Sequence, residues 1–377
     1  MRFFFRVLLA LTIFASYAYA ETKPATEIGT LAGAAYRIDV PADWNRRVVV
    51  FFHGTSETPV AYAASEPLSP MFRHVLQRKY ALIQSGYSAC GWALEEAEKD
   101  SERLRQHFAA SHGKPDQFLV MGMSMGGALV AMTIEQQPGI YAGALSLCGV
   151  LEPSDVLFQR DFALAAAFDF YFPGVLPPFV PVPADYVADK RMVAKIAAAL
   201  ASKPAAMQSL LRWYGTATAK SLPDVIADTL TDFRDLQHRA HGNPLGNADL
   251  IYVNSGDDAE LNAGVHRYRA DANAAAWLAR WYTPSGKLTR PLLAVHDIGD
   301  PLVPAAGAFT YALTAQRAGH ADNFVQQYVA HEGHCVFKPD EVARAFDQLV
   351  DWVDAGKRPV PGALPAPAGV QTKETTR

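Results

Sequence analysis

Short apolar runs alternate with longer amphipathic segments along most of the chain. Six runs rich in Val, Ile, Leu and Phe predict strands at Arg47–His53, Tyr80–Ser85, Phe118–Gly122, Ala144–Cys148, Leu292–His296 and Phe324–Val329. Most of them are apolar on both faces, as the strands of a buried parallel sheet are. Tyr36–Val40 follows a Gly-Ala stretch and predicts an antiparallel hairpin at the sheet edge.

Helical patterns fill the spaces between these strands. Three helices are expected at Trp92–Phe108, at 124 to about 137, and at Asp340–Asp354. The first has acidic residues early and basic residues late, an order that complements the helix dipole. Strand and helix in turn predict an α/β fold with a mostly parallel sheet and helices on both faces.

The alternation stops between about 151 and 290, where alanine, aromatic residues and proline dominate. Helical patterns remain at Arg191–Tyr214 and Pro223–Arg239, the second with Ser221 and Asp224 as a start resembling a capping box. We expect a helical lid or cap inserted into the core, because the strand pattern resumes directly afterwards; an independent second domain is the alternative. The core then comprises 21–150 and 291–356, and the Pro- and Thr-rich segment 357–377 is expected to be a disordered tail.

Composition narrows the functional class. Half of the 377 residues are apolar and the formal net charge is −4, with no long basic run. This is typical of a globular protein, and nothing indicates a nucleic-acid partner.

The first twenty residues differ from the rest. Two arginines precede the apolar stretch Val7–Ala15, and Ala18-Tyr19-Ala20 supplies small residues where a signal peptidase cuts. This pattern predicts a signal peptide cleaved before Glu21, and hence a secreted or periplasmic protein. A membrane anchor is the alternative, but the stretch is shorter than the ~20 residues of a spanning helix. No later segment is apolar for long enough, so we expect no membrane association after cleavage.

The most specific motif is Gly122-Met123-Ser124-Met125-Gly126-Gly127, which follows an apolar strand and opens a helical segment. A serine on a sharp strand-to-helix turn needs small residues two before and two after it, because the chain crosses itself closely there. The turn would point the Ser124 hydroxyl into the crevice at the carboxyl ends of the strands. We therefore predict Ser124 as a nucleophile; a serine that caps a helix is the alternative.

A nucleophilic serine needs a base, and the strand order indicates where to look. The segment His331-Glu332-Gly333-His334-Cys335 follows the last strand, and Asp297-Ile298-Gly299-Asp300 follows the strand before it. We expect His334 as the base rather than His331, because Gly333 gives its loop freedom. We expect Asp300 as the acid rather than Asp297, although Asp300 could instead cap the next helix.

The oxyanion of such a reaction needs two N–H donors. Met125 stands at the start of a helix, and Thr55 follows His53-Gly54 at the end of a strand, so their N–H groups are the candidates. No cofactor or metal is expected, because no second ligand cluster accompanies His331, His334 and Cys335. Asp257, Asp258 and Glu260 are more typical of a solvated loop than of a calcium site.

Four segments together resemble the α/β-hydrolase superfamily, over roughly 36–356 apart from the insertion: His53-Gly54, Gly122–Gly127, Asp300–Pro304 and Gly333-His334. Four others are similar to exported bacterial α/β-hydrolases that are loosely related to prolyl-oligopeptidase-like and feruloyl-esterase-like enzymes: Ser85–Ser88, Gly91–Glu96, Cys148–Val150 and Gly333–Cys335. The resemblance implies exported hydrolysis without a settled substrate.

The positions of two cysteines are compatible with an active site at the carboxyl ends of the strands. Cys148 ends a strand on the side of the site and Cys335 adjoins the expected base, so a Cys148–Cys335 disulfide is possible; buried free thiols are the alternative. We expect an esterase that takes a small-molecule ester, and the Phe-rich insertion favours an apolar or aromatic acyl group unless those residues form its own core. A serine exopeptidase or amidase is the second hypothesis, and a binding protein on a hydrolase scaffold the third.

Overall fold

The computed structural model describes residues 24–366, and its centre is one nine-stranded sheet. The strands follow the spatial order β1-β2-β4-β3-β5-β6-β7-β8-β9. Their bounds are β1 Ala25–Leu31, β2 Ala34–Val40, β3 Arg47–Phe52, β4 Ala81–Ser85, β5 Gln117–Met123, β6 Tyr141–Leu147, β7 Leu292–Gly299, β8 Phe324–Glu332 and β9 Gly362–Ala363.

Only β2 runs against its neighbours, pairing antiparallel with both β1 and β4. The pairs from β4 to β9 are all parallel. The predicted mostly parallel sheet is confirmed, and so is the predicted hairpin at its edge. Because parallel strands end at one edge, the loops after β4, β3, β5, β6, β7 and β8 lie in that order along it.

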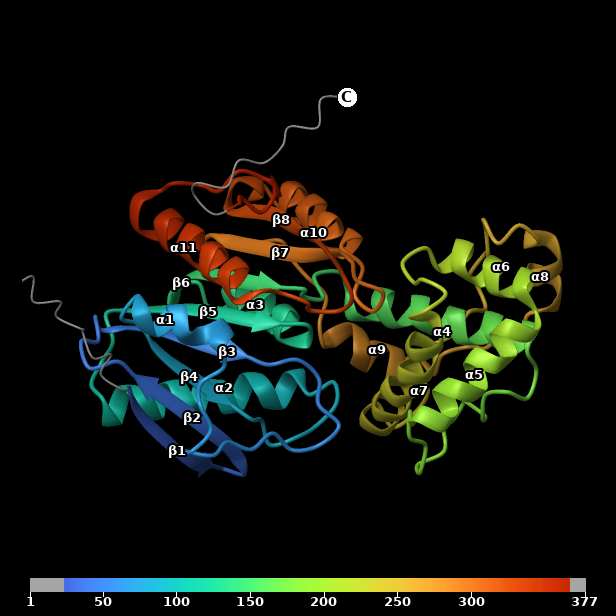
Figure 1. Cartoon of the computed structure of the whole chain (residues 1–377), viewed down its shortest axis with the longest axis horizontal. Helices are drawn as coiled ribbons and strands as arrows, with labels where there is room; N and C mark the ends of the chain where they lie inside the picture. Colours follow the sequence, from blue (N-terminus) through green and yellow to red (C-terminus); the bar gives the residue numbers. More distant parts are fainter. Residues whose placement is uncertain (1–23, 367–377) are drawn as a thin grey trace, which may run out of the picture.

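Helices cover both faces of the sheet (Figure 1). Residues of α2, α3 and α10 share one buried cluster with the sheet, and residues of α11 share the other with Phe72 and Val75. The bounds in the core are η1 Pro70–Phe72, α1 Arg73–Gln77, α2 Leu94–Ser111, α3 Met125–Gln136, α10 Ala306–Arg317, η2 Ala321–Asn323 and α11 Pro339–Ala355.

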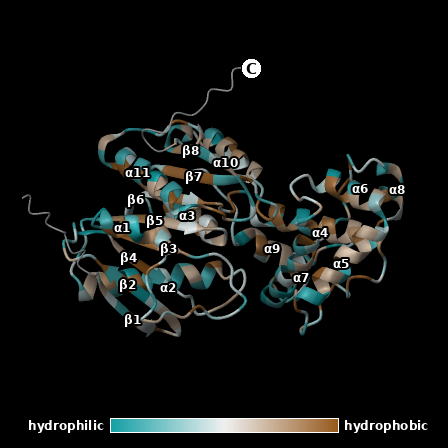
Figure 2. Cartoon of the chain, viewed as in Figure 1, coloured by the Kyte–Doolittle hydropathy of each residue, from teal (hydrophilic) through white to brown (hydrophobic). Residues whose placement is uncertain are grey.

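The strand β3 shows why its sequence is apolar throughout. Val48, Val50 and Phe52 belong to one buried cluster, whereas Val49 and Phe51 belong to the other. A strand that is buried on both faces cannot alternate apolar with polar residues. The central strands are accordingly coloured as hydrophobic in Figure 2.

The segment between β6 and β7 forms a helical lobe beside the core (Figure 1). Its helices are α4 Ser154–Tyr171, α5 Lys190–Ser202, α6 Pro204–Tyr214, α7 Leu222–Arg239, α8 Asp258–Gly264 and α9 Ala272–Arg280. The helical pattern at Arg191–Tyr214 is two helices rather than one, because Pro204 has no N–H to continue α5 and instead begins α6. Ser221 precedes α7 but makes no side-chain cap, and its hydroxyl accepts from the N–H of Thr218 instead.

The aromatic residues of this insertion pack mainly against one another. Phe162 contacts Phe179, Phe233 and Tyr268, with ring centroids 5.4–5.6 Å apart. Phe162 and Phe233 are fully buried. These side chains form the core of the insertion, and they therefore give no support to the predicted apolar or aromatic acyl group.

The predicted disordered tail is wrong for its first part. Residues 357–366 follow a fixed course, because β9 pairs with β8 and the guanidinium of Arg358 donates to the carbonyls of Asp322 and Phe324. The predicted signal peptide at 1–20 and the end of the tail at 367–377 lie outside the described residues. Within residues 24–366 no helix is long and apolar enough to cross a membrane.

Candidate active site

Ser124 occupies a sharp turn between β5 and α3. Its φ of 57° and ψ of −124° lie in a region that L-residues rarely adopt. A Cβ on Gly126 would run into the carbonyl oxygen of Phe52, and one on Gly122 would run into the carbonyl oxygen of Gly126. Only glycine therefore fits on either side of the serine, as the motif requires.

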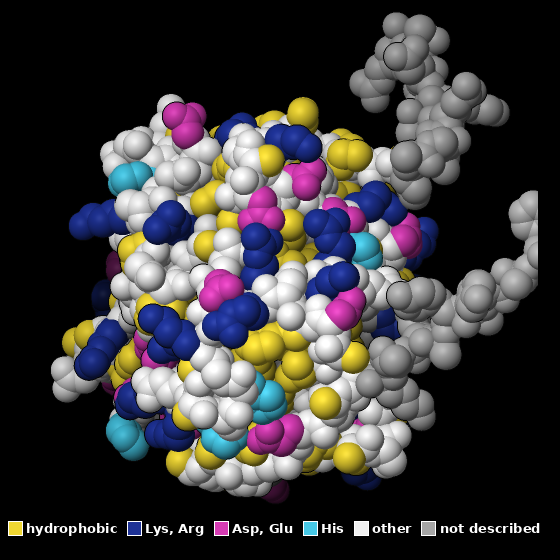
Figure 3. All heavy atoms as spheres, turned by 90° about the vertical axis from the view of Figure 1, so that its left-hand side faces the viewer, with side chains coloured by type: hydrophobic (Ala, Val, Ile, Leu, Met, Phe, Trp, Pro, Cys, Tyr) yellow, Lys and Arg dark blue, Asp and Glu magenta, His cyan; other side chains and the backbone are white. Residues whose placement is uncertain are grey.

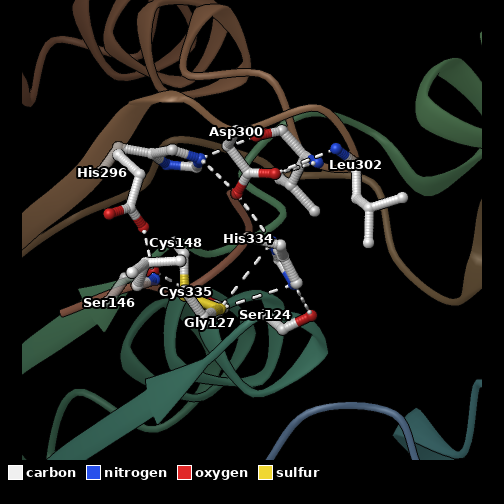
Figure 4. The surroundings of a disulfide bond; sticks show 12 residues. Ser124, Gly127, Ser146, Cys148, His296, Asp300, Leu302, His334 and Cys335 are labelled. Atoms are coloured by element: carbon white, nitrogen blue, oxygen red, sulfur yellow. Dashed lines mark hydrogen bonds and ion pairs between the residues drawn. A yellow bond between two sulfur atoms is a disulfide. The ribbon is translucent and has the colours of Figure 1, made fainter. Parts of the chain in front are cut away.

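Ser124, His334 and Asp300 form one hydrogen-bonded chain (Figure 4). The Ser124 hydroxyl donates to Nε2 of His334 over 2.8 Å. Nδ1 of the same ring donates to Oδ2 of Asp300 over 2.6 Å. The three residues come from the loops after β5, β8 and β7, and they follow the chain in the order serine, acid, histidine.

This strand order, with a serine at the turn after its fifth strand, decides the fold. The chain has the α/β-hydrolase fold. In a fold of this kind the crevice at the carboxyl ends of the strands is where a substrate would meet the serine.

The carboxylate of Asp300 is buried but well supplied with donors. Its Oδ1 accepts from the N–H groups of Leu302 and Val303, at 2.9 and 3.0 Å. Burial alone would raise the pKa of Asp300, but interactions with His296, His334 and the Val303 N–H together hold this pKa below its usual value. Asp300 is therefore ionised at neutral pH.

His296 is a residue of the site that sequence reasoning missed. It is 1% exposed, and its Nε2 donates to the carbonyl of Val303 over 2.8 Å while lying 3.5 Å from Oδ2 of Asp300. It thus steadies the acid from the side opposite His334 (Figure 4). No sequence pattern indicated this contact with Asp300, because His296 stands at the end of an apolar run that predicts only a strand.

The two rival residues have other partners. Nε2 of His331 pairs with the carboxylate of Glu341 at 2.9 Å. Asp297 is fully buried and accepts from the Val336 N–H at 3.2 Å, which ties down the loop that carries His334. Burial, together with the nearby charge of Asp300, raises the pKa of Asp297 to about 6.

The candidate oxyanion donors lie around the serine. Met125 is the first residue of α3, where N–H groups have no partner within the helix. A Cβ on Gly54 would lie 3.0 Å from Cβ of Ser124, so the chain before Thr55 runs directly past the nucleophile. His53, which precedes Gly54, is stacked on Tyr87 with ring centroids 3.9 Å apart. This contact stabilises the turn after β3.

A disulfide joins Cys148 to Cys335, as the positions of the two cysteines suggested. Cys148 follows β6, and Cys335 directly follows His334. The sulfur of Cys335 lies 3.4 Å from Nε2 of His334, so the bond lies against the imidazole itself (Figure 4). It fixes the histidine loop to the sheet.

Hydrogen bonds attach the insertion to loops of the core on both sides of the loop of Ser124. On one side, the guanidinium of Arg160 donates to the carbonyl of Leu302, and the Tyr214 hydroxyl donates to that of Pro301 over 3.0 Å. On the other side, Asp235 on α7 accepts from the Trp92 N–H over 2.7 Å. The loops after β3 and β5 lie between these two attachments.

Among residues 24–366, no group of three or more His, Cys, Asp or Glu side chains is arranged to hold a metal ion. Asp258, one of the residues weighed for calcium, accepts instead from the N–H groups of Asn254 and Ser255.

Comparison with known proteins gives only distant similarity. No family model matches the sequence, and neither does any curated protein. The structure resembles an acylaminoacyl peptidase of Pyrococcus horikoshii at 10% identity and a TM-score of 0.48, covering 90% of this chain and 43% of the peptidase. It also resembles Candida antarctica lipase A in its closed state at 13% identity and a TM-score of 0.47, covering 90% of this chain and 79% of the lipase. An esterase/lipase from an uncultured bacterium aligns at 12% identity and a TM-score of 0.44, and the alignment covers 88% of this chain and 86% of the esterase/lipase. The chain spans less than half the length of the peptidase, and similarity at this level says nothing about the reaction.

Proposed function

We propose that the protein is a serine hydrolase that cleaves carboxylic esters through an acyl-enzyme. The observation that carries this proposal is the chain of two short hydrogen bonds from Asp300 through His334 to Ser124. A serine hydroxyl is a weak nucleophile by itself, and an adjacent imidazole held in one tautomer by a carboxylate activates it.

The reaction would proceed in two halves. The Ser124 hydroxyl attacks the acyl carbonyl while Nε2 of His334 takes its proton, and the resulting imidazolium is stabilised by the ionised Asp300. The tetrahedral intermediate collapses, His334 returns the proton to the leaving alcohol, and an acyl-serine remains. Water then attacks the acyl-serine with His334 as the base, which releases the carboxylic acid and restores the serine.

The developing oxyanion would be bound by the N–H groups of Met125 and Thr55. The place of Met125 at the start of α3 and the close approach of Gly54, next to Thr55, to Ser124 support this proposal. Removal of one donor costs roughly 3 kcal/mol of transition-state stabilisation in hydrolases of this type.

A serine exopeptidase or amidase is the second candidate. An exopeptidase would also need a charged anchor near the serine for the terminal group of its substrate, an acid for an amino terminus or a base for a carboxyl terminus. The triad itself serves either reaction, because both proceed through an acyl-enzyme.

We further propose that the insertion acts as a fixed cap over the site rather than as a freely opening lid. Its attachments through Arg160, Tyr214 and Asp235 to loops on both sides of the loop of Ser124 support this role. Export of a mature chain that begins at Glu21 is also proposed. The disulfide supports export, because such bonds persist in oxidising compartments.

Labelling with an alkyl fluorophosphonate tests the central proposal. We expect the folded protein to be labelled on Ser124, and the Ser124→Ala variant to lose both labelling and ester turnover while keeping its unfolding temperature. Ser221→Ala, a change at a serine of the insertion, is the matched control and should behave as the wild type. A folded protein that the probe leaves unlabelled would contradict the proposal and favour a binding protein.

Two substrate series separate the remaining candidates. p-Nitrophenyl esters of graded acyl length should be hydrolysed faster than aminoacyl p-nitroanilides. Turnover of the anilides without turnover of the esters would reverse the order of the two candidates and make the protein an amidase or exopeptidase.

A further inference from the structure

The loop that follows the triad acid belongs to no helix or strand. Residues 301–304 lie between β7 and α10 without regular secondary structure, so contacts with other parts of the protein must satisfy their backbone groups. The course of this loop matters for the reaction, because the N–H groups of Leu302 and Val303 both donate to Oδ1 of Asp300 (Figure 4). The loop therefore holds the carboxylate whose other oxygen, Oδ2, binds His334.

Two side chains of the insertion donate to carbonyl groups of the same loop. The Tyr214 hydroxyl donates to the Pro301 carbonyl over 3.0 Å, and Nη2 of Arg160 donates to the Leu302 carbonyl over 2.9 Å. Tyr214 is the last residue of α6, and Arg160 lies on α4. The loop of the acid is thus bound by two helices that are not part of the core.

The bonds to the insertion and the bonds to Asp300 are made by the same peptide groups. The carbonyl of Pro301 and the N–H of Leu302 belong to one planar unit, and the carbonyl of Leu302 and the N–H of Val303 belong to the next. Both peptide bonds are trans, so in each unit the C=O and the N–H point in opposite directions. A donor that fixes the carbonyl therefore also fixes the direction of the N–H, and it polarises that N–H for the bond it makes. Each peptide group binds the insertion on one side and the triad acid on the other.

The two donors are themselves held in place by Asp161, which lies on α4 next to Arg160. Its Oδ1 accepts from Nη2 of Arg160 over 3.2 Å. The same oxygen lies 2.9 Å from the Tyr214 hydroxyl, whose one proton is shared between Asp161 and the Pro301 carbonyl. The guanidinium of Arg160 also lies over the Tyr214 ring, 4.6 Å from its centroid. The positions of both donors are therefore fixed before a substrate binds.

Burial distinguishes the cluster of Arg160, Asp161 and Tyr214 from an ordinary surface ion pair. Basic and acidic side chains are interspersed over the outer face of the core (Figure 3), where ion pairs contribute little to stability because water competes for them. The side chains of Arg160 and Asp161 are only 21% and 10% exposed, and Tyr214 is 5% exposed. Hydrogen bonds that are shielded from water are stronger, so this cluster is suited to holding a loop in one position.

We propose that Arg160 and Tyr214 are positioning residues of the triad, which act on Asp300 through the peptide groups of its loop. This inference deepens the proposed function and rests on it. The two side chains keep the carboxylate aimed at Nδ1 of His334, and the imidazolium that forms in the reaction is stabilised only while that aim is kept. The insertion then regulates the reacting groups as well as covering them, and a change at this contact should lower kcat without a matching change in KM.

Tyr214→Phe tests the proposal, because it removes the hydroxyl and keeps the ring. For a p-nitrophenyl ester we expect kcat to fall roughly tenfold, less than the ~100-fold that a displacement of about 1 Å can cost, with KM nearly unchanged. The acid limb of the pH profile of kcat/KM should also move to lower pH, because a less well placed Asp300 stabilises the imidazolium less. Arg160→Lys keeps a positive charge beside Asp161 but loses the planar guanidinium, and it should change kcat and the pH profile in the same direction.

Tyr186→Phe is the matched control. Tyr186 is also 5% exposed, and its hydroxyl donates over 2.8 Å to a carbonyl within the insertion, that of Ala227. This variant should lower the unfolding temperature about as much as Tyr214→Phe, but it should keep the kcat and the pH profile of the wild type. Wild-type kcat and pH profile in both Tyr214→Phe and Arg160→Lys, or an equal loss of kcat in Tyr186→Phe, would overturn the inference. Ester turnover by the wild type would leave the proposed function intact in either case.

If the wild type hydrolyses no ester, the proposed function fails, and proton NMR still decides whether Tyr214 positions the acid. The Nδ1–H proton of His334, assigned by its absence in His334→Gln, resonates at low field while its hydrogen bond to Asp300 is short. We expect this resonance to move to higher field in Tyr214→Phe and to stay in place in Tyr186→Phe. A resonance that is unchanged in Tyr214→Phe would contradict the positioning role.

Discussion

Removal of the Cys148–Cys335 disulfide should lower the stability of the protein strongly and its kcat only moderately. The two cysteines are 187 residues apart, so the bond closes a long loop in the unfolded chain. In the chain-entropy model a loop of this length corresponds to about 5 kcal/mol of stability at room temperature. The double variant Cys148→Ala/Cys335→Ala should therefore unfold at a much lower urea concentration than the wild type.

The effect on catalysis should be smaller, because other bonds still hold the histidine loop. The Gly333 N–H donates to the Gly299 carbonyl over 3.1 Å, and the Val336 N–H donates to Asp297. We expect kcat for a p-nitrophenyl ester to fall on the order of tenfold, less than the ~100-fold that a misplacement of about 1 Å can cost.

Both measurements need a control for the loss of a thiol, and Cys90→Ala supplies it because Cys90 is the free cysteine of the described residues. It should match the wild type in urea and in kcat. A double variant as stable as the wild type would show that the bond does not constrain the unfolded chain. A loss of all activity in the still-folded double variant would refute the view that backbone contacts position His334.

Three further changes test other parts of the site. Asp300→Asn keeps an acceptor for the loop N–H groups but favours the wrong imidazole tautomer, so kcat should fall about 10⁴-fold without unfolding. Gly126→Ala drives a Cβ into the Phe52 carbonyl and should cost about 3 kcal/mol or more in thermal unfolding, whereas Gly139→Ala, which meets open space, should be tolerated. Asp297→Asn should abolish one pH dependence of stability. Because the pKa of Asp297 is raised to about 6 in the folded protein, the wild type should lose on the order of 1 kcal/mol of stability as the pH rises from 4 to above 6. The urea midpoint of the wild type should fall over this pH range, and that of the variant should not.

Much of the fold was predictable because its strands are buried on both faces. Continuous apolar runs such as Arg47–His53 have few other uses in a protein of this composition, and the helices between them dictate parallel pairing. The nucleophile was equally accessible, since the glycines around Ser124 reflect a backbone crossing that no other residue allows. The preference for His334 over His331 rested on the freedom that Gly333 gives its loop, and the hydrogen bonds now give each histidine a different partner.

The remaining features depend on tertiary contacts that leave no local pattern. A two-residue strand such as β9 is too short to show any periodicity, and its Pro-rich flanks resemble a disordered tail. Pro204 broke a helical pattern at a position where a proline also suits a helix start. His296 looked like the end of an apolar strand, and only the course of the loop after β7 brings its ring to Asp300.

The insertion shows the same limit most clearly. Its helical pattern is visible in the sequence, but its place against the core depends on contacts between distant residues: the Trp92 N–H donates to Asp235, and the Tyr214 hydroxyl donates to the Pro301 carbonyl. In the order of the strands, the loop of Ser124 lies between the loops of Trp92 and Pro301. The periodicity of a helix shows which of its faces is buried but not which part of the chain covers that face, so the sequence alone could not predict this position.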